Sequence, residues 1–227
     1  FLFLNLILKK KTINIRELIF EDEEKTSNNH AILGILSIIF IIFIILEFFS
    51  LNFPIQKLDL VHSGDFLTPA QNYLSTKNFW ISSYTIHGGS DIFYPLLVWK
   101  IFGVQSIGAV AISFILLTLL IKFLSVFFSY QLTKILNLNK ETKILFFTIF
   151  TSILISMSRY SVQFGHGYYL SHRDIYIILF LIFFIELFIH SKFRFLSTIS
   201  ITLIATTSIL FHIDTGVYIN FILFFYC

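Results

Sequence analysis

Residues 59–103 read DLVHSGDFLTPAQNYLSTKNFWISSYTIHGGSDIFYPLLVWKIFG and interrupt a chain that is otherwise mostly apolar. This stretch contains Pro69, Pro95 and the Gly88–Gly89 pair, with three of the six aspartates and two of the seven histidines of the chain. It has no apolar run of about 20 residues, the length that crosses the hydrocarbon core of a bilayer. We therefore expect a structured polar region here, flanked by the apolar body of the protein.

The composition of the whole chain indicates a membrane protein. Hydrophobic residues make up 56% of its 227 residues and charged residues 13%, whereas soluble domains contain about 25% charged residues. A single cysteine excludes a disulfide framework and a Cys-x-x-Cys metal site. The net charge of +3 is small and the basic residues are scattered, so nucleic acid is not expected as a partner. Because the sequence starts at Phe1 and stops at Cys227 within an apolar run, we expect it to be a fragment.

Long apolar runs predict an all-α fold, a polytopic transmembrane helical bundle. Residues 1–30 predict a cytoplasmic segment that is amphipathic and then acidic. The transmembrane domain is expected over residues 31–227. Runs that are long enough or nearly long enough to cross a bilayer predict spans at residues 31–51, 104–130, 143–157, 174–190, 195–213 and, incompletely, 216–227.

Residues 52–103 are predicted to form a long external loop that carries short helices on the membrane surface. Thr68–Pro69 begins one helical pattern, because proline is acceptable in a first helical turn. Tyr94–Pro95 begins a second pattern, which ends at Phe102–Gly103. The aromatic side chains expected at the level of the lipid headgroups are Trp80, Tyr84, Tyr94 and Trp99.

The distribution of basic residues predicts the orientation. With the N-terminus in the cytoplasm, the cytoplasmic segments hold ten of the sixteen Lys and Arg residues, which satisfies the positive-inside rule. We therefore expect a multi-pass protein of a bacterial-type inner membrane, in direct contact with membrane lipid. The outer side then collects five aspartates and five histidines, which are Asp59, Asp65, Asp91, Asp174, Asp214, His62, His87, His166, His172 and His212.

This outer side is the predicted functional site, because a carboxylate near a membrane surface can act as a general base. The predicted catalytic residues are Asp65 and Asp91. The predicted substrate-binding residues are His62, His87, Arg159, His166, His172, Arg173 and Asp214. The histidine spacing does not predict a metal site, so no metal ligand is assigned; a divalent metal held jointly by Asp and His from several loops stays open. The sequence has no phosphate loop, G-x-G-x-x-G, G-x-S-x-G or H-E-x-x-H motif.

Several of these residues have two interpretations. Asp65 lies just before the helix expected at Thr68, so it is either a general base or the cap of that helix. Arg159 and Arg173 lie at the outer ends of spans, where arginine either binds phosphate with its planar fork or anchors the helix at the interface. Asp174 beside Arg173 is equally consistent with an ion-pair partner of that arginine at the start of a helix, where the dipole favours a carboxylate.

A few ionisable residues fall within or beside predicted spans. Glu47 lies near the far end of its span, and we expect it to reach the headgroups by snorkelling rather than to catalyse. Lys122 and Glu186 are the mid-span exceptions, and such sparse charge argues against a transporter. Asp214, just before Gly216, is also consistent with a simple turn residue.

The first loop and its flanks, roughly residues 31–130, resemble the GT-C glycosyltransferases. These polytopic membrane enzymes transfer a sugar from a polyprenyl phosphate or diphosphate donor to an acceptor outside the cytoplasm. The resemblance implies an essential acid in the first external loop, short surface helices there, and a lipid-linked sugar donor as the partner. It is carried by Asp65, Tyr73, Leu74, Trp80, His87, Gly88, Tyr94, Pro95, Leu96, Leu97, Phe102 and Gly103.

Two departures from the family pattern bear on the catalytic acid. Family members often have an Asp-Glu pair, whereas Asp65 is followed by Phe66. The usual tandem prolines after the turn histidine are replaced by Gly88–Gly89, with Asp91 as a possible substitute acid. We therefore predict a membrane glycosyltransferase that uses a polyprenyl-phosphate sugar. The alternatives are a transporter and a non-enzymatic polytopic membrane protein, and the sequence leaves the sugar, the acceptor and the oligomeric state open.

Overall fold

The structure of the chain is a computed structural model that describes residues 27–50, 60–78, 88–163, 171–189 and 194–226. Within these ranges, side chains are described except at residues 27–30, 50, 60–66, 157–163, 171–172, 188–189 and 226. The described part is almost entirely helical and contains no β-strand, so the prediction of an all-α fold is confirmed there.

Eight helices make up the described part of the chain. They are α2 (Ser27–Ser50), α3 (Leu60–Thr76), α4 (Ser90–Phe102), α5 (Ile107–Ile135), α6 (Lys140–Gln163), α7 (Ser171–Ile189), α8 (Arg194–Phe211) and α9 (Ile213–Tyr226). Every apolar run that the sequence predicts as a span is a helix, and most of the ends differ by only a few residues.

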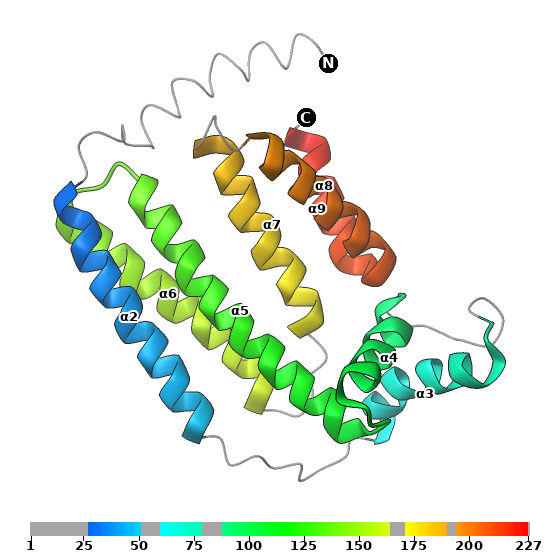
Figure 1. Cartoon of the computed structure of the whole chain (residues 1–227). Coiled ribbons are helices and arrows are strands. Elements are labelled where there is room, and N and C mark those ends of the chain that lie inside the picture. The colour runs from blue at the N-terminus through cyan, green and yellow to red at the C-terminus, as the bar shows by residue number, and fades with distance from the viewer. Residues whose placement is uncertain (1–26, 51–59, 79–87, 164–170, 190–193, 227) are drawn as a thin grey trace.

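The helices form a bundle with a separate layer at one end (Figure 1). The long helices run alternately in opposite directions, and α5 occupies the centre, where it packs on α2, α6 and α7. At the other side of α7 lies α8, which in turn packs on α9. The shorter helices α3 and α4 pack on each other and lie at the end of the bundle where α5 begins.

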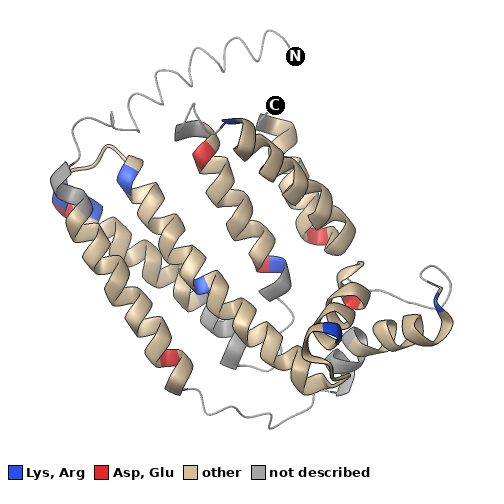
Figure 2. Cartoon of the chain, viewed as in Figure 1, with Lys and Arg blue, Asp and Glu red and all other residues tan. Residues whose placement is uncertain are grey.

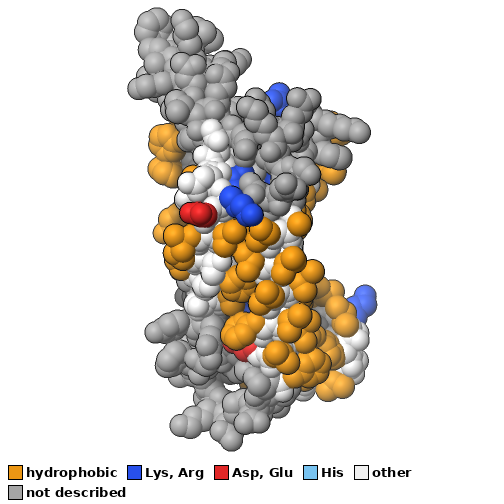
Figure 3. Space-filling view, turned by 90° about the vertical axis from the view of Figure 1, so that its left-hand side faces the viewer, with side chains coloured by type: hydrophobic (Ala, Val, Ile, Leu, Met, Phe, Trp, Pro, Cys, Tyr) orange, Lys and Arg blue, Asp and Glu red, His pale blue; other side chains and the backbone are white. Residues whose placement is uncertain are grey.

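Three helices are long and apolar enough to cross a membrane, namely those covering Ala31–Phe49, Ile107–Ile135 and Arg194–Phe211. The buried fraction of their apolar windows is 11%, 39% and 22%, so most residues in these windows are not fully buried, and large apolar side chains are exposed on α2 and α8. Charged residues lie mainly near the helix ends, and long stretches between them carry none (Figure 2). Apolar side chains spread over much of the described part of the face shown in Figure 3.

Helix α4 packs on the start of α5 through aromatic and small apolar side chains. Trp99 is 5% exposed and donates its indole N–H to the Ser106 carbonyl at 3.0 Å. Tyr94 stacks on Phe114 with ring centroids 4.8 Å apart. The Trp99 ring lies in the core of the layer with Ala70 and Val98, and its position at headgroup level stays a prediction. Trp80 and Tyr84 lie outside the described residues.

Both surface helices begin earlier than the proline positions suggest. α3 begins at Leu60 rather than near Thr68, and Pro69 lies inside it. α4 begins at Ser90 rather than at Tyr94, and Pro95 lies inside it. The predicted end of α4 is confirmed, because Gly103 follows Phe102 with a left-handed φ of 69°, a conformation that glycine adopts without strain.

The helices α8 and α9 form a tight antiparallel hairpin with only His212 between them. A Cβ on Gly216 would lie 2.3 Å from the Cα of Ile209, so the two backbones approach too closely for any other residue. Asn220 donates its amide to the Ala205 carbonyl at 3.1 Å and to the Gly216 carbonyl at 2.8 Å. Small residues and side-chain amides of this kind are typical of helix pairs in membranes.

Candidate functional site

The glycine pair at the start of α4 joins the surface layer to the α8–α9 hairpin. The Gly89 N–H donates to the Leu210 carbonyl at 3.0 Å. A Cβ on Gly88 or Gly89 would lie 3.0 to 3.3 Å from the carbonyl oxygens of Leu210 or Phe211, and Gly88 has a φ of +121°. Glycine at these two positions is therefore explained by a backbone-to-backbone contact.

Asp91 lies in the first turn of α4, two residues after this contact, and is 0% exposed. A carboxylate is favoured at a helix N-terminus, where the helix dipole is positive. Pro95, four residues later, has no N–H for the Asp91 carbonyl, so the usual helical hydrogen bond is missing at this turn. The structure encloses Asp91 within the junction, where its carboxylate is shielded from solvent.

His212 lies on the other side of the same junction. It follows the last residue of α8, is 2% exposed, and its Nδ1 lies 3.4 Å from the hydroxyl of Thr215. Asp91 and His212 are each two residues away in sequence from one end of the Gly89–Leu210 hydrogen bond. The sequence placed both residues on one side of the membrane, and the fold brings them to one buried junction.

Arg173 and Asp174 form an ion pair in the first turn of α7. The guanidinium Nε donates to the Asp174 carboxylate at 3.0 Å, and the two side chains are 34% and 32% exposed. This contact confirms the ion-pair interpretation of Asp174. It uses only the inner nitrogen of Arg173, and within the described part of the chain the two terminal nitrogens have no hydrogen-bond partner. The open half of the guanidinium can therefore bind a phosphate oxygen.

The structure describes the other predicted site residues to different extents. Asp214 is exposed in the first turn of α9, so it belongs to a helix start. Asp65 lies in the second turn of α3, so it is not the cap of a helix that begins near Thr68. Residues that lie on described helices but whose side chains are not described are His62, Asp65, Arg159 and His172. His87 and His166 lie outside the described residues.

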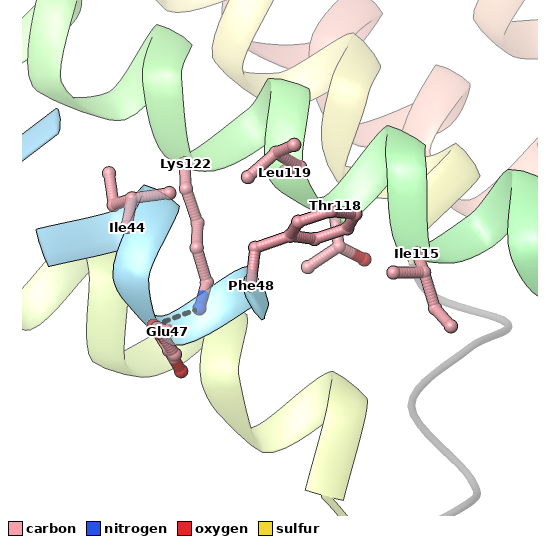
Figure 4. Close-up of a pocket in the computed structure, with 7 residues that line it drawn as sticks. All are labelled: Ile44, Glu47, Phe48, Ile115, Thr118, Leu119 and Lys122. Atoms are coloured by element: carbon pink, nitrogen blue, oxygen red, sulfur yellow. Dashed lines mark hydrogen bonds and ion pairs between the residues drawn. The ribbon is translucent and has the colours of Figure 1, made fainter. Parts of the chain in front are cut away.

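A buried ion pair that the sequence reasoning missed joins α2 to α5. The Lys122 ammonium lies 2.9 Å from the Glu47 carboxylate, and the two side chains are 7% and 15% exposed (Figure 4). The expectation that Glu47 reaches the headgroups by itself is wrong, because its carboxylate binds Lys122. Two opposite charges in neighbouring apolar runs were the available signal, since an unpaired charge in such a run is costly.

A small pocket lies beside this pair and is lined by Ile44, Glu47, Phe48, Ile115, Thr118, Leu119 and Lys122. Its free volume of about 20 Å³ has room for about one water molecule. A sugar or a lipid headgroup does not fit into this volume. Among the described residues, no group of three or more His, Cys, Asp or Glu side chains is placed to hold a metal ion.

Comparisons with protein-family models, with curated proteins and with solved structures give no match for this chain. The resemblance of residues 31–130 to the GT-C glycosyltransferases therefore stays a prediction from the sequence.

Proposed function

We propose that the chain is a multi-pass membrane protein that transfers a group from a lipid-linked phosphate donor, as in the GT-C glycosyltransferases. The membrane part of this proposal is supported by three apolar helices of spanning length and by the large apolar side chains exposed on α2 and α8. Lipid is the natural environment of such a surface, because monomeric soluble proteins rarely expose large contiguous apolar patches.

The orientation of the proposed protein follows from its basic residues. The positive-inside rule places the N-terminus in the cytoplasm, and the helices alternate in direction (Figure 1). The α3–α4 layer then lies on the outer surface of the membrane, together with the start of α7. Arg173 is on this side and Arg194, which follows the other end of α7, is on the cytoplasmic side.

The observation that carries the functional proposal is the half-open guanidinium of Arg173. Asp174 accepts a hydrogen bond from its Nε at 3.0 Å, and among the described residues no partner occupies the terminal nitrogens, which can bind a phosphate oxygen at the end of the bundle that carries the α3–α4 layer. Arg173 is thus the proposed contact for the phosphate of the donor. Asp65, on α3, is the proposed general base for the acceptor, and the enclosed Asp91 positions α4.

The transporter alternative receives less support from the geometry. The pocket beside Lys122 and Glu47, where two charges lie on apolar helices, has a free volume of about 20 Å³ and accepts about one water molecule. A transported solute larger than water needs a larger cavity in the spans.

The proposal is tested by transfer from a polyprenyl-phosphate-linked radioactive sugar in proteoliposomes that contain the full-length protein. Arg173→Gln is expected to lower the rate of transfer at limiting donor by at least tenfold, because a charge-assisted phosphate contact contributes roughly 1.5 to 3 kcal/mol. Arg194→Gln, at the start of α8, is the matched control and is expected to leave the rate unchanged. Equal rates for wild type, Arg173→Gln and Asp65→Asn would contradict the proposed site.

A further inference from the structure

The joint between α2 and α5 contains an unusual combination of a buried charge and an adjacent space. Lys122 is in the middle of α5, and Glu47 is three residues before the end of α2. Their side chains meet at 2.9 Å, at a site whose other walls are mostly apolar (Figure 4). We propose that Glu47, Lys122 and one bound water molecule form a charged joint that fixes α2 on the rest of the bundle.

The hydrogen-bonding capacity of Lys122 points to the water. An ammonium group has three N–H donors, and in the described part of the chain Lys122 makes one hydrogen bond, to Glu47. Its side chain is only 7% exposed, so bulk solvent does not satisfy the remaining donors. The pocket beside it has a free volume of about 20 Å³, enough for about one water molecule.

The walls of the pocket supply the other partners that a buried water needs. Such waters make about three hydrogen bonds. Lys122 offers donors, whereas the carboxylate of Glu47 and the hydroxyl oxygen of Thr118 offer acceptors, and all three residues line the pocket. The Thr118 hydroxyl donates its own hydrogen to the Phe114 carbonyl at 2.9 Å, so its oxygen acts as an acceptor here. Since the charges of Glu47 and Lys122 cancel, a neutral ligand suits this pocket better than an ion.

The position of α2 makes the bundle dependent on this joint. Only 11% of the residues in the apolar window of α2 are buried, and α2 packs on α5 and α6 alone among the helices with substantial contacts. Its packed face meets α5 and α6 through large side chains such as Leu33, Phe40 and Ile44 rather than the small residues that let membrane helices approach closely. Removing the Glu47 carboxylate takes the ion-pair partner from the Lys122 ammonium in an apolar site, and removing Lys122 takes the opposite charge from Glu47, whereas removing both charges does neither.

The distance between α2 and α6 reports whether the joint is intact. Spin labels at Ile38 on α2 and Leu145 on α6, both on exposed positions, are introduced into the full chain with Cys227→Ser, in lipid nanodiscs. The wild-type joint is expected to give one narrow distance distribution by double electron–electron resonance. Glu47→Gln and Lys122→Met are each expected to broaden it, because α2 then samples more than one position.

Two further variants separate a charged joint from a general loss of packing. The charge exchange Glu47→Lys with Lys122→Glu is expected to restore a narrow distribution, and so is the apolar pair Glu47→Leu with Lys122→Met. A second label pair, at Ile177 on α7 and Leu203 on α8, is the control that shows the remaining bundle to be folded. If both single variants keep the narrow distribution while this control is unchanged, the proposed joint is wrong.

The water is tested separately by an experimental structure that resolves ordered solvent. We expect a water oxygen within about 3 Å of the Lys122 Nζ, in hydrogen-bonding distance. A pocket filled by a lipid acyl chain or by a rearranged side chain would overturn the hydrated form of the joint.

Discussion

The bundle holds two of its outer helices, α9 and α2, by opposite means. Helix α9 is joined to α8 by backbone proximity, with Gly216 against Ile209 and with Asn220 bonded to the Ala205 carbonyl. Helix α2 is joined to α5 by large apolar side chains and by the Glu47–Lys122 ion pair. The first joint depends on the absence of a side chain, and the second depends on the presence of two charges.

This difference determines which substitutions each joint tolerates. A glycine contact has no substitute, because any Cβ occupies the space that the opposing backbone needs. A buried ion pair can be replaced, because well-packed apolar residues often take its place at little cost in stability. The two joints are therefore expected to fail in different ways when they are mutated.

The largest effect is expected from Gly216→Ala, which tests the backbone joint. The added Cβ would lie 2.3 Å from the Ile209 Cα and 2.4 Å from the Ile209 nitrogen, so α8 and α9 must separate. We expect a loss of more than about 4 kcal/mol in the free energy of unfolding, in the range reserved for severe steric defects. Thermal unfolding of the protein in detergent measures this loss.

Gly34→Ala is the matched control for Gly216→Ala. A Cβ at Gly34, in α2, would have no atom within 4 Å. Alanine is the better helix former by roughly 1 kcal/mol, so a small gain or no change is expected. Similar losses at both positions would show that the close approach of α8 and α9 does not decide the stability.

A smaller effect is expected at the charged joint, where single and double substitutions should diverge. Lys122→Met takes the opposite charge away from the Glu47 carboxylate in a mostly apolar site, and a loss of about 3 kcal/mol in the free energy of unfolding is expected. Glu47→Leu with Lys122→Met is expected to recover most of this loss. A double-mutant cycle from thermal unfolding measures the coupling, and additive losses would contradict a direct interaction between the two charges.

The sequence predicts the long helices better than it predicts their joints. The apolar runs predict spans at 104–130 and 195–213, close to α5 at Ile107–Ile135 and α8 at Arg194–Phe211. Charged and polar residues bound these runs, so composition alone delimits the helices. Glu47 and Lys122 are 75 residues apart in the sequence, and their contact depends on how the two helices are rotated about their axes. A single sequence carries no direct record of that rotation.

The start of the surface helices shows another limit of the sequence. Ser90 and Asp91 belong to α4, although the sequence predicts that this helix begins at Tyr94–Pro95. Tertiary contact overrides this local preference, because α4 begins where Gly89 bonds to Leu210 on α8. The same contact buries Asp91, which the sequence had predicted as a catalytic residue on an open surface.

The smallest effect is expected at a third kind of joint, the neutral polar contact between α4 and α5. The Ser113 hydroxyl donates its single hydrogen to the Val110 carbonyl at 2.6 Å, so the Tyr94 hydroxyl donates to the Ser113 oxygen at 2.9 Å. Tyr94→Phe removes this hydrogen bond and is expected to cost about 1 kcal/mol of the free energy of unfolding at neutral pH. Tyr218→Phe, on the exposed face of α9, is the control.

The wild type and Tyr94→Phe differ in their free energy of unfolding, and the pH dependence of that difference distinguishes a hydrogen bond of the Tyr94 hydroxyl from simple packing. Burial raises the pKa of the Tyr94 phenol above its ordinary value of 10.0, so the folded state keeps the proton at a pH where the unfolded state loses it. The stability that Tyr94 contributes is therefore complete below about pH 10 and declines above it. Denaturant unfolding from about pH 9 to about pH 11 should show the wild type approaching the Tyr94→Phe variant. A constant difference across this range would mean that the Tyr94 hydroxyl is not enclosed in the joint, and the neutral contact would then contribute less than either of the other two.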